Sequence, residues 1–142
     1  MSNVQHKVKN LLNNIQQDYK RYTQLVELLN NQRTLLIERK ADRLEQLNKD
    51  VEHLYQQLSE STTERAAMLQ TLNIPATAEG MQKFFSHLPA VFSDKARLLW
   101  NMLEEQVITC KQINDRNARL LNTQQDILNS LLGNQPDLIY QR

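Results

Sequence analysis

The chain has 142 residues, 17 of them lysine or arginine and 16 aspartate or glutamate, for a net charge of +1. A balance this close to zero argues against a dedicated nucleic-acid-binding protein, which usually carries a strong basic excess. With 2 glycines and 3 prolines, turn-rich all-β folds and glycine-loop nucleotide-binding folds are strongly disfavoured.

The rest of the composition points to a helical protein of the cytoplasm. The chain contains 23 leucines, 16 glutamines and 14 asparagines. No apolar run approaches the roughly 18 residues of a membrane span, and the first ten residues lack the apolar stretch of a signal peptide. A single cysteine, Cys110, fits a reducing compartment. We therefore expect a cytoplasmic location and no membrane insertion.

The first half of the chain predicts two long helices. Residues 1–74 contain neither glycine nor proline, yet one helix of that length would extend about 110 Å, too far for a compact domain of this mass. Asp42 and Glu45 have the spacing of a capping box, which places the break just before them. The sequence thus predicts helices over about 3–38 and 42–72.

Both helices carry an apolar stripe with steps of three and four residues. The first comprises Val4, Val8, Leu11, Ile15, Tyr19, Tyr22, Leu25, Leu29 and Leu36, and the second Leu44, Leu47, Val51, Leu54, Leu58, Met68 and Leu72. Ser61 and Arg65 interrupt the second stripe. Residues 1–40 carry a net charge of +4 and residues 41–74 one of −3, which suits an antiparallel hairpin.

A connector, a third long helix and a tail follow. Residues 73–89 form the connector, with a short helix over about 78–87 that Thr77 can cap. The third long helix covers about 90–132, Gly133 terminates it, and we expect residues 133–142 to be a flexible tail. The fold class is therefore all-α, a single domain in which a helical hairpin and a third long helix make an elongated three-helix bundle.

The apolar stripe of the third helix contains two amides. It comprises Ala96, Leu99, Leu103, Val107, Cys110, Ile113, Asn117, Leu120, Gln124, Ile127 and Leu131. In one interpretation, Asn117 and Gln124 are polar layers that fix the register of a coiled coil. In the other, this half of the helix accepts a helix of another protein. The sequence leaves both interpretations open.

Sites for catalysis, metals or cofactors are not indicated. The three histidines lie far apart, and none is followed by a ligand-type residue three or four positions later. Cys110 lies on the apolar stripe, which favours a buried thiol over a nucleophile. Glu104 and Glu105 point about 100° apart on a helix, so they do not form an acid–base pair. We expect no enzymatic activity, no metal and no cofactor.

Several landmarks follow one another along the chain. The second helix carries the leucine repeat Leu44-x-x-Leu47-x-x-x-Val51-x-x-Leu54, and the third helix carries Trp100, Cys110 and Ile113-Asn114-x-x-Asn117-Ala118-x-Leu120-Leu121, followed in the tail by Pro136 and Tyr140. In these landmarks the chain resembles the FlgN family of flagellar type III export chaperones, and the resemblance covers most of the chain. Ala118 stands where the family pattern has glycine, which favours a continuous, stiffer helix, and Gln141 replaces the glycine that often follows the tyrosine.

The resemblance implies a non-enzymatic cytosolic chaperone. Its cargo would be the C-terminal regions of the hook-associated proteins FlgK and FlgL, kept from premature association and delivered to the export gate protein FlhA. The expected cargo-binding residues are Asn114, Asn117, Leu120, Leu121, Gln124, Ile127, Leu128 and Leu131, although some must face the first two helices. The expected gate-docking residues are Leu138, Ile139 and Tyr140, an expectation that depends on the resemblance.

A competing interpretation is a structural coiled-coil adaptor that homo-oligomerises through the stripe of the third helix. Stoichiometry separates the two, since a chaperone that self-associates weakly should yield that contact to its cargo. A small enzyme, the third class considered, has almost no support in the sequence.

Overall fold

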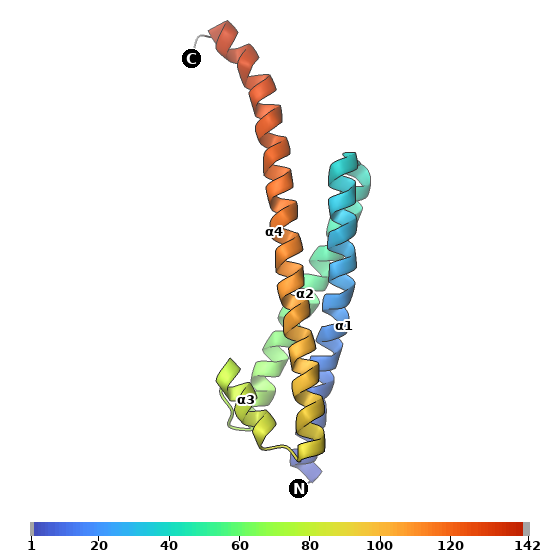
Figure 1. Ribbon diagram of the computed structural model, residues 1–142, viewed down its shortest axis with the longest axis vertical. Helices are drawn as coiled ribbons and strands as arrows, with labels where there is room; N and C mark the ends of the chain where they lie inside the picture. Colours follow the sequence, from blue (N-terminus) through green and yellow to red (C-terminus); the bar gives the residue numbers. More distant parts are fainter. Residues whose placement is uncertain (1, 141–142) are drawn as a thin grey trace.

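The computed structural model describes the backbone of residues 2–140 and the side chains of residues 3–133. In this part of the chain there are four helices and no strands: α1 (Ser2–Glu38), α2 (Ala41–Thr71), α3 (Ala78–Ser86) and α4 (Ala90–Tyr140). Figure 1 shows an elongated bundle in which α1 and α4 rise side by side and α2 descends beside α1. The predicted all-α class is confirmed.

The turn between α1 and α2 is shorter than predicted. Arg39 adopts a left-handed conformation with φ of 56°, and the amide of Lys40 donates back to the carbonyl of Leu35 at 3.1 Å, as at a Schellman helix end. The helix then restarts at once, with Lys40 as N-cap and no side-chain cap. The prediction that Asp42 caps α2 is therefore wrong, because the chain reverses before reaching it. Asp42 lies in the first turn, where its charge suits the helix dipole.

Two apolar clusters hold the helices together. The lower one joins all four helices through Leu11, Ile15, Leu69, Met81, Phe84, Phe85, Ala96 and Leu103. The upper one joins α1, α2 and α4 through Leu25, Leu29, Val51, Leu54, Leu58, Cys110 and Ile113. Because α1 packs against both α2 and α4, it is the central helix of the bundle.

The connector from α2 to α4 folds α3 against the lower cluster. Asn73 is left-handed with φ of 58° and ends α2. Thr77 then caps α3, its Oγ1 accepting from the amide of Gly80 at 3.0 Å. Phe85 of α3 is fully buried, and its ring lies 6.3 Å from that of Trp100 on α4, centroid to centroid. The short helix thus closes the lower end of the core.

Replacing Gly80 by alanine is expected to destabilise this connector. A Cβ at this position would lie 1.9 Å from the carbonyl oxygen of Pro75, so the backbone must move. Overpacking of this kind costs about 1–3 kcal/mol, which urea unfolding would measure. The exposed neighbour Glu79 is the control, and Glu79→Ala should change the stability by about 0.5 kcal/mol or less. An unchanged stability of Gly80→Ala would contradict the tight approach.

The last helix runs further than the sequence predicts. The sequence predicts that the helix ends near residue 132 with Gly133 as terminator, but α4 continues to Tyr140. No glycine in the described chain has a positive φ, so Gly133 does not adopt the left-handed conformation that terminates helices.

Candidate functional site

Helices α1 and α4 are joined by a hydrogen-bond ladder with one constant register. Three side chains of α4 donate to backbone carbonyls of α1: Cys110 Sγ to Tyr22 at 3.5 Å, Asn117 Nδ2 to Leu29 at 2.8 Å, and Gln124 Nε2 to Leu36 at 2.9 Å. Each donor lies 88 residues after its acceptor. The two helices therefore run parallel, with the seven-residue period of a coiled-coil seam.

Asn117 belongs to an amide layer that crosses the whole bundle. Its Nδ2 also donates to Oε1 of Gln32 on α1 at 2.8 Å, and Nε2 of Gln32 donates to Oδ1 of Asn48 on α2 at 2.9 Å. Asn117 is 3% exposed. This geometry is that of a register-fixing polar layer, the first of the two interpretations left open by the sequence.

The seam of α4 continues after α1 has ended. With the offset of 88 residues, the last residue of α1, Glu38, lies opposite residue 126. The next two seam positions are Ile127 and Leu131, which are 50% and 64% exposed. At equivalent positions lower in the bundle, Cys110 and Ile113 are buried. From Ala96 to Gln124 the stripe is thus buried or half-buried beside α1, except at Val107, which is 39% exposed, and it is uncovered above residue 126.

We call residues 127–140 of α4 the projecting segment, because the helix runs on past the α1–α2 hairpin (Figure 1). Side chains are described up to Gly133. The exposed apolar side chains of its described part are Ile127, Leu128, Leu131 and Leu132. Contiguous exposed apolar residues of this kind mark interaction sites.

The predicted cargo-binding residues divide into two groups. Asn114, Leu121, Ile127, Leu128 and Leu131 are exposed, whereas Asn117 is buried and Leu120 and Gln124 are half-buried. Since Asn117 and Gln124 bind α1, the uncovered part of the predicted site consists of Asn114 and of leucines and an isoleucine. Leu132, also exposed, is an addition that the stripe itself does not include. The side chains of Leu138, Ile139 and Tyr140, the predicted gate-docking residues, lie outside the described residues.

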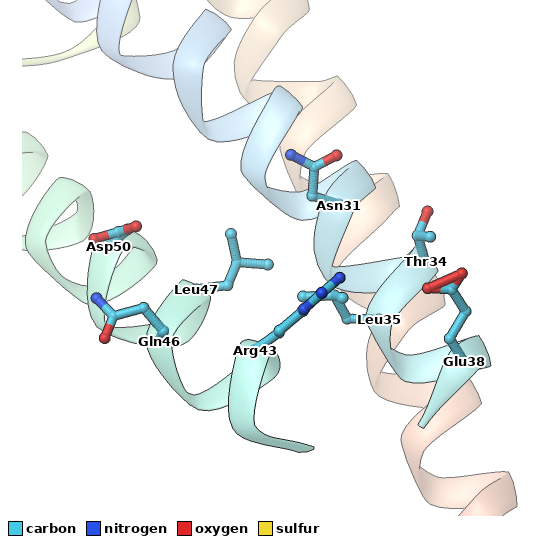
Figure 2. A pocket seen from close by; sticks show the side chains of 8 residues that line it. All are labelled: Asn31, Thr34, Leu35, Glu38, Arg43, Gln46, Leu47 and Asp50. Carbon is cyan, nitrogen blue, oxygen red and sulfur yellow. The ribbon is translucent and has the colours of Figure 1, made fainter. Parts of the chain in front are cut away.

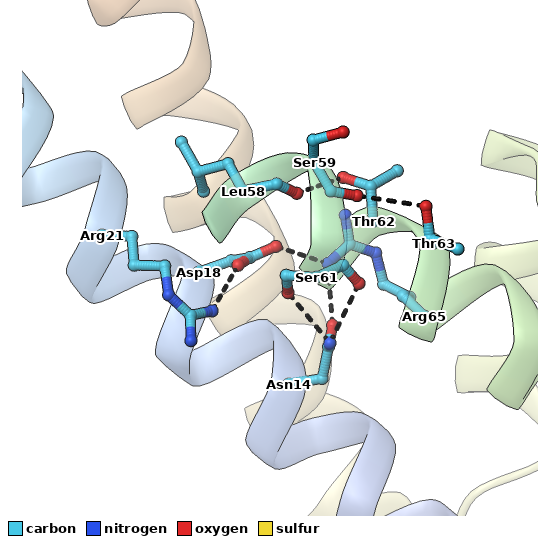
Figure 3. Close-up of polar contacts among 9 residues, drawn as sticks. All are labelled: Asn14, Asp18, Arg21, Leu58, Ser59, Ser61, Thr62, Thr63 and Arg65. Atoms are coloured by element: carbon cyan, nitrogen blue, oxygen red, sulfur yellow. Dashed lines mark hydrogen bonds and ion pairs between the residues drawn. The ribbon is translucent and has the colours of Figure 1, made fainter. Parts of the chain in front are cut away.

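A polar cluster between α1 and α2 explains why the stripe of α2 is interrupted (Figure 3). Asp18 is 1% exposed and accepts from Arg65 at 2.7 Å and from Arg21 at 2.9 Å. Asn14 accepts from Arg65 at 2.8 Å and donates to Oγ of Ser61 at 3.0 Å. The Arg65 guanidinium also lies 5.8 Å from the centroid of the Trp100 ring. All these groups have partners, so the cluster joins helices and offers no free chemical group.

A hollow lies at the tip of the hairpin, between the end of α1 and the start of α2. It has a volume of about 430 Å³ and is lined by Asn31, Thr34, Leu35, Glu38, Arg43, Gln46, Leu47 and Asp50. Figure 2 shows Arg43 extending from α2 toward α1 across this hollow. No group of three potential metal ligands occurs among the described residues. Within the same part of the chain, no helix is both long and apolar enough to span a membrane.

Cys110 is expected to be an unreactive thiol in the folded protein. It is buried between α1 and α4, and burial raises the pKa of the thiol from 9.0 to about 11. At pH 8 the thiolate fraction is then about 100-fold lower than in the unfolded chain, since each pKa unit is a factor of ten. We expect the rate of modification by a thiol reagent to fall by at least that factor on folding, because burial also restricts access to the sulfur. Equal rates in native protein and in urea would contradict this.

The pKa shift also has a consequence for stability at high pH. A raised pKa means that folding favours the protonated thiol, so this contribution is complete below pH 9 and is lost as the pH rises toward 11. A Cys110→Ala variant should therefore lose less stability than the parent between these two pH values. Urea unfolding across this range measures the difference.

Comparisons with known proteins agree with this architecture. The sequence profile of the FlgN protein family matches residues 1–134. The crystal structure of a protein from Pseudomonas aeruginosa described as a flagella synthesis protein, FlgN, is similar with a TM-score of 0.71 and 26% identity, covering 80% of this chain and 87% of that chain. No curated protein sequence matches the chain significantly.

Proposed function

Because the chain belongs to the FlgN family of flagellar proteins, we propose that it is a cytoplasmic export chaperone for hook-associated proteins. Its cargo would be the C-terminal helical regions of FlgK and FlgL, which it would keep from premature association and deliver to the export gate protein FlhA. The proposal includes no enzymatic activity and no cofactor. It is carried by one observation, the seam of α4 that loses its partner helix at residue 126.

The uncovered seam suits a helix as its occupant. Below residue 126 the stripe of α4 is filled by α1 in a parallel, seven-residue register. Above it, Ile127 and Leu131 offer the same stripe without a neighbour. A cargo helix with an apolar face would take the place that α1 occupies lower down, with anchors at three- and four-residue steps. Flagellar cargo with apolar terminal helices fits this requirement.

The composition of the segment is consistent with a surface that is exposed between binding events. From residue 120 to residue 133 the only charged side chain is Asp126, and the polar positions are amides and hydroxyls. Amides and hydroxyls can hydrogen-bond to water in the free state and to a partner in the complex. These amides and hydroxyls therefore support reversible binding of a cargo helix without requiring a fixed pattern of charges on it.

The gate-docking part of the proposal concerns Leu138, Ile139 and Tyr140. These residues follow the cargo-binding stretch on the same helix, so a bound cargo and the gate would meet at one end of the chaperone. A tyrosine combines a large apolar ring with a hydroxyl, a composition favoured at protein interfaces. Tyr140→Ala should weaken binding to the soluble part of FlhA and leave cargo binding intact.

Calorimetric titration of the full chain with C-terminal fragments of FlgK and FlgL tests the proposal. Saturable binding near one-to-one by at least one fragment is the expected result. A negative heat-capacity change should accompany it, because apolar surface is buried. The absence of binding by both fragments would overturn the proposal. The coiled-coil adaptor would then remain as the function of this helical scaffold.

A further inference from the structure

A second apolar surface lies at the opposite end of the bundle from the projecting segment. It is a groove of about 750 Å³ where the start of α1 meets the start of α4; we call it the basal groove. Its apolar lining includes Val4, Val8 and Leu12 from α1 and Leu88, Phe92 and Leu99 from the connector and α4. Phe92 is 56% exposed, so much of this surface faces solvent.

The two charged side chains that line the basal groove, Lys9 and Lys95, are both basic, and no carboxylate is among its lining residues. An apolar groove with a basic rim favours an amphipathic helix with a negative charge beside its apolar face.

The projecting segment of the same chain meets this requirement. Its exposed residues Ile127, Leu128, Leu131 and Leu132 follow directly after Asp126, and residues 120–133 contain no basic side chain. A copy cannot fill its own groove, because 28 residues of continuous helix, ~42 Å, separate Leu99 from Ile127. We propose that the basal groove binds the projecting segment of a second copy of this chain.

The contact would join two different surfaces, so it is heterologous and leaves one groove and one segment free in each pair. Association would therefore proceed head to tail and increase with protein concentration. The inference rests on the proposed function in one respect, since the segment is the one assigned to cargo. Cargo and the second copy would then compete, and the leucines would be covered while no cargo is present.

Sedimentation of the full chain over a range of concentrations, with two variants, tests the proposal. Phe92→Asp places a charge in the groove, and Leu128→Asp with Leu131→Asp places charges on the segment. Each variant alone should self-associate about tenfold more weakly or worse, since a charge is desolvated at the contact. Mixed together, they should form a one-to-one pair, because one retains an intact segment and the other an intact groove. Lys95→Glu, a milder change in the rim, should also weaken self-association.

Three results would overturn the inference: a parent chain that stays monomeric at all concentrations, a Phe92→Asp variant that self-associates like the parent, or a mixture that remains monomeric. A symmetric contact between the projecting segments of two copies would give the second result. Cargo binding separates this inference from the proposed function. If Phe92→Asp forms no pair with the Leu128→Asp, Leu131→Asp variant but still binds FlgK, the proposed self-contact is wrong and the cargo function stands. If the two variants form a pair but the parent chain binds no cargo, the cargo function is wrong and the self-contact stands.

Discussion

Replacing Leu128 and Leu131 together by aspartate is expected to weaken cargo binding by about 1,000-fold, because each leucine that anchors an interface contributes about 2 kcal/mol and each 1.4 kcal/mol is a factor of ten. The fold should not suffer, since the two side chains are 52% and 64% exposed in the free protein. Calorimetry with the FlgK fragment measures the loss of affinity. Far-UV circular dichroism and the thermal midpoint should match those of the parent.

Leu98→Asp provides a matched control. Leu98 lies on the same helix and is 61% exposed, but it belongs neither to the projecting segment nor to the lining of the basal groove. The Leu98→Asp variant should bind cargo like the parent chain. Parent-like affinity in the Leu128→Asp, Leu131→Asp variant would place the cargo site elsewhere. An equal loss in Leu98→Asp would mean that added negative charge, and not the position, causes the effect.

The periodicity of the sequence was sufficient to predict the helices and the stripe, because both depend on local spacing. The predicted helices over 3–38, 42–72 and 78–87 lie within two residues of α1, α2 and α3 at each end. The exact turn was not predictable. Helix ends of this type usually show a glycine, and here the left-handed residue is Arg39, which carries no such signal.

The division of the α4 stripe into covered and uncovered parts needed the structure. The sequence places Asn117, Gln124, Ile127 and Leu131 on one stripe, but it contains no information on where α1 ends beside them. That information is the register of 88 residues between the two helices, a tertiary quantity. With it, Asn117 and Gln124 become links to α1, while Ile127 and Leu131 become the start of an uncovered surface.

The interruption of the α2 stripe could not be explained from the sequence for the same reason. Ser61 and Arg65 are polar residues on an apolar stripe, and their hydrogen-bonding partners lie far away in the sequence. Asn14 and Asp18 are 47 residues before Ser61 and Arg65, respectively. A polar residue on an apolar stripe can be a defect, a functional group or half of a buried pair, and only the partner across the bundle distinguishes these.

Removing the carboxylate of Asp18 is expected to cost about 3–5 kcal/mol of folding free energy, because Asp18→Ala leaves the guanidinium of Arg65 partly buried without its counter-ion. Arg65 approaches Asp18 at 2.7 Å, and their side chains are 14% and 1% exposed. Urea unfolding measures the loss. The pair Lys40–Glu38, with both side chains 46% exposed, is the matched control, and Glu38→Ala should change the stability by about 1 kcal/mol or less.

A double variant decides whether the buried pair stabilises the bundle or selects its register. Asp18→Leu with Arg65→Met removes both charges and the Arg65 donor to Asn14, while Asn14 keeps its bonds to Ser61. Replacing a buried ion pair by apolar residues is often close to neutral. We therefore expect it to recover most of the stability lost in Asp18→Ala, with a coupling of about 2–3 kcal/mol between the two sites. A double variant as unstable as the single one would show that the ion pair itself contributes the stability. Recovery of the stability would show that the role of the ion pair is to position the two helices. Asp18 and Arg65 can pair in only one alignment of α1 with α2, so the pair selects that alignment.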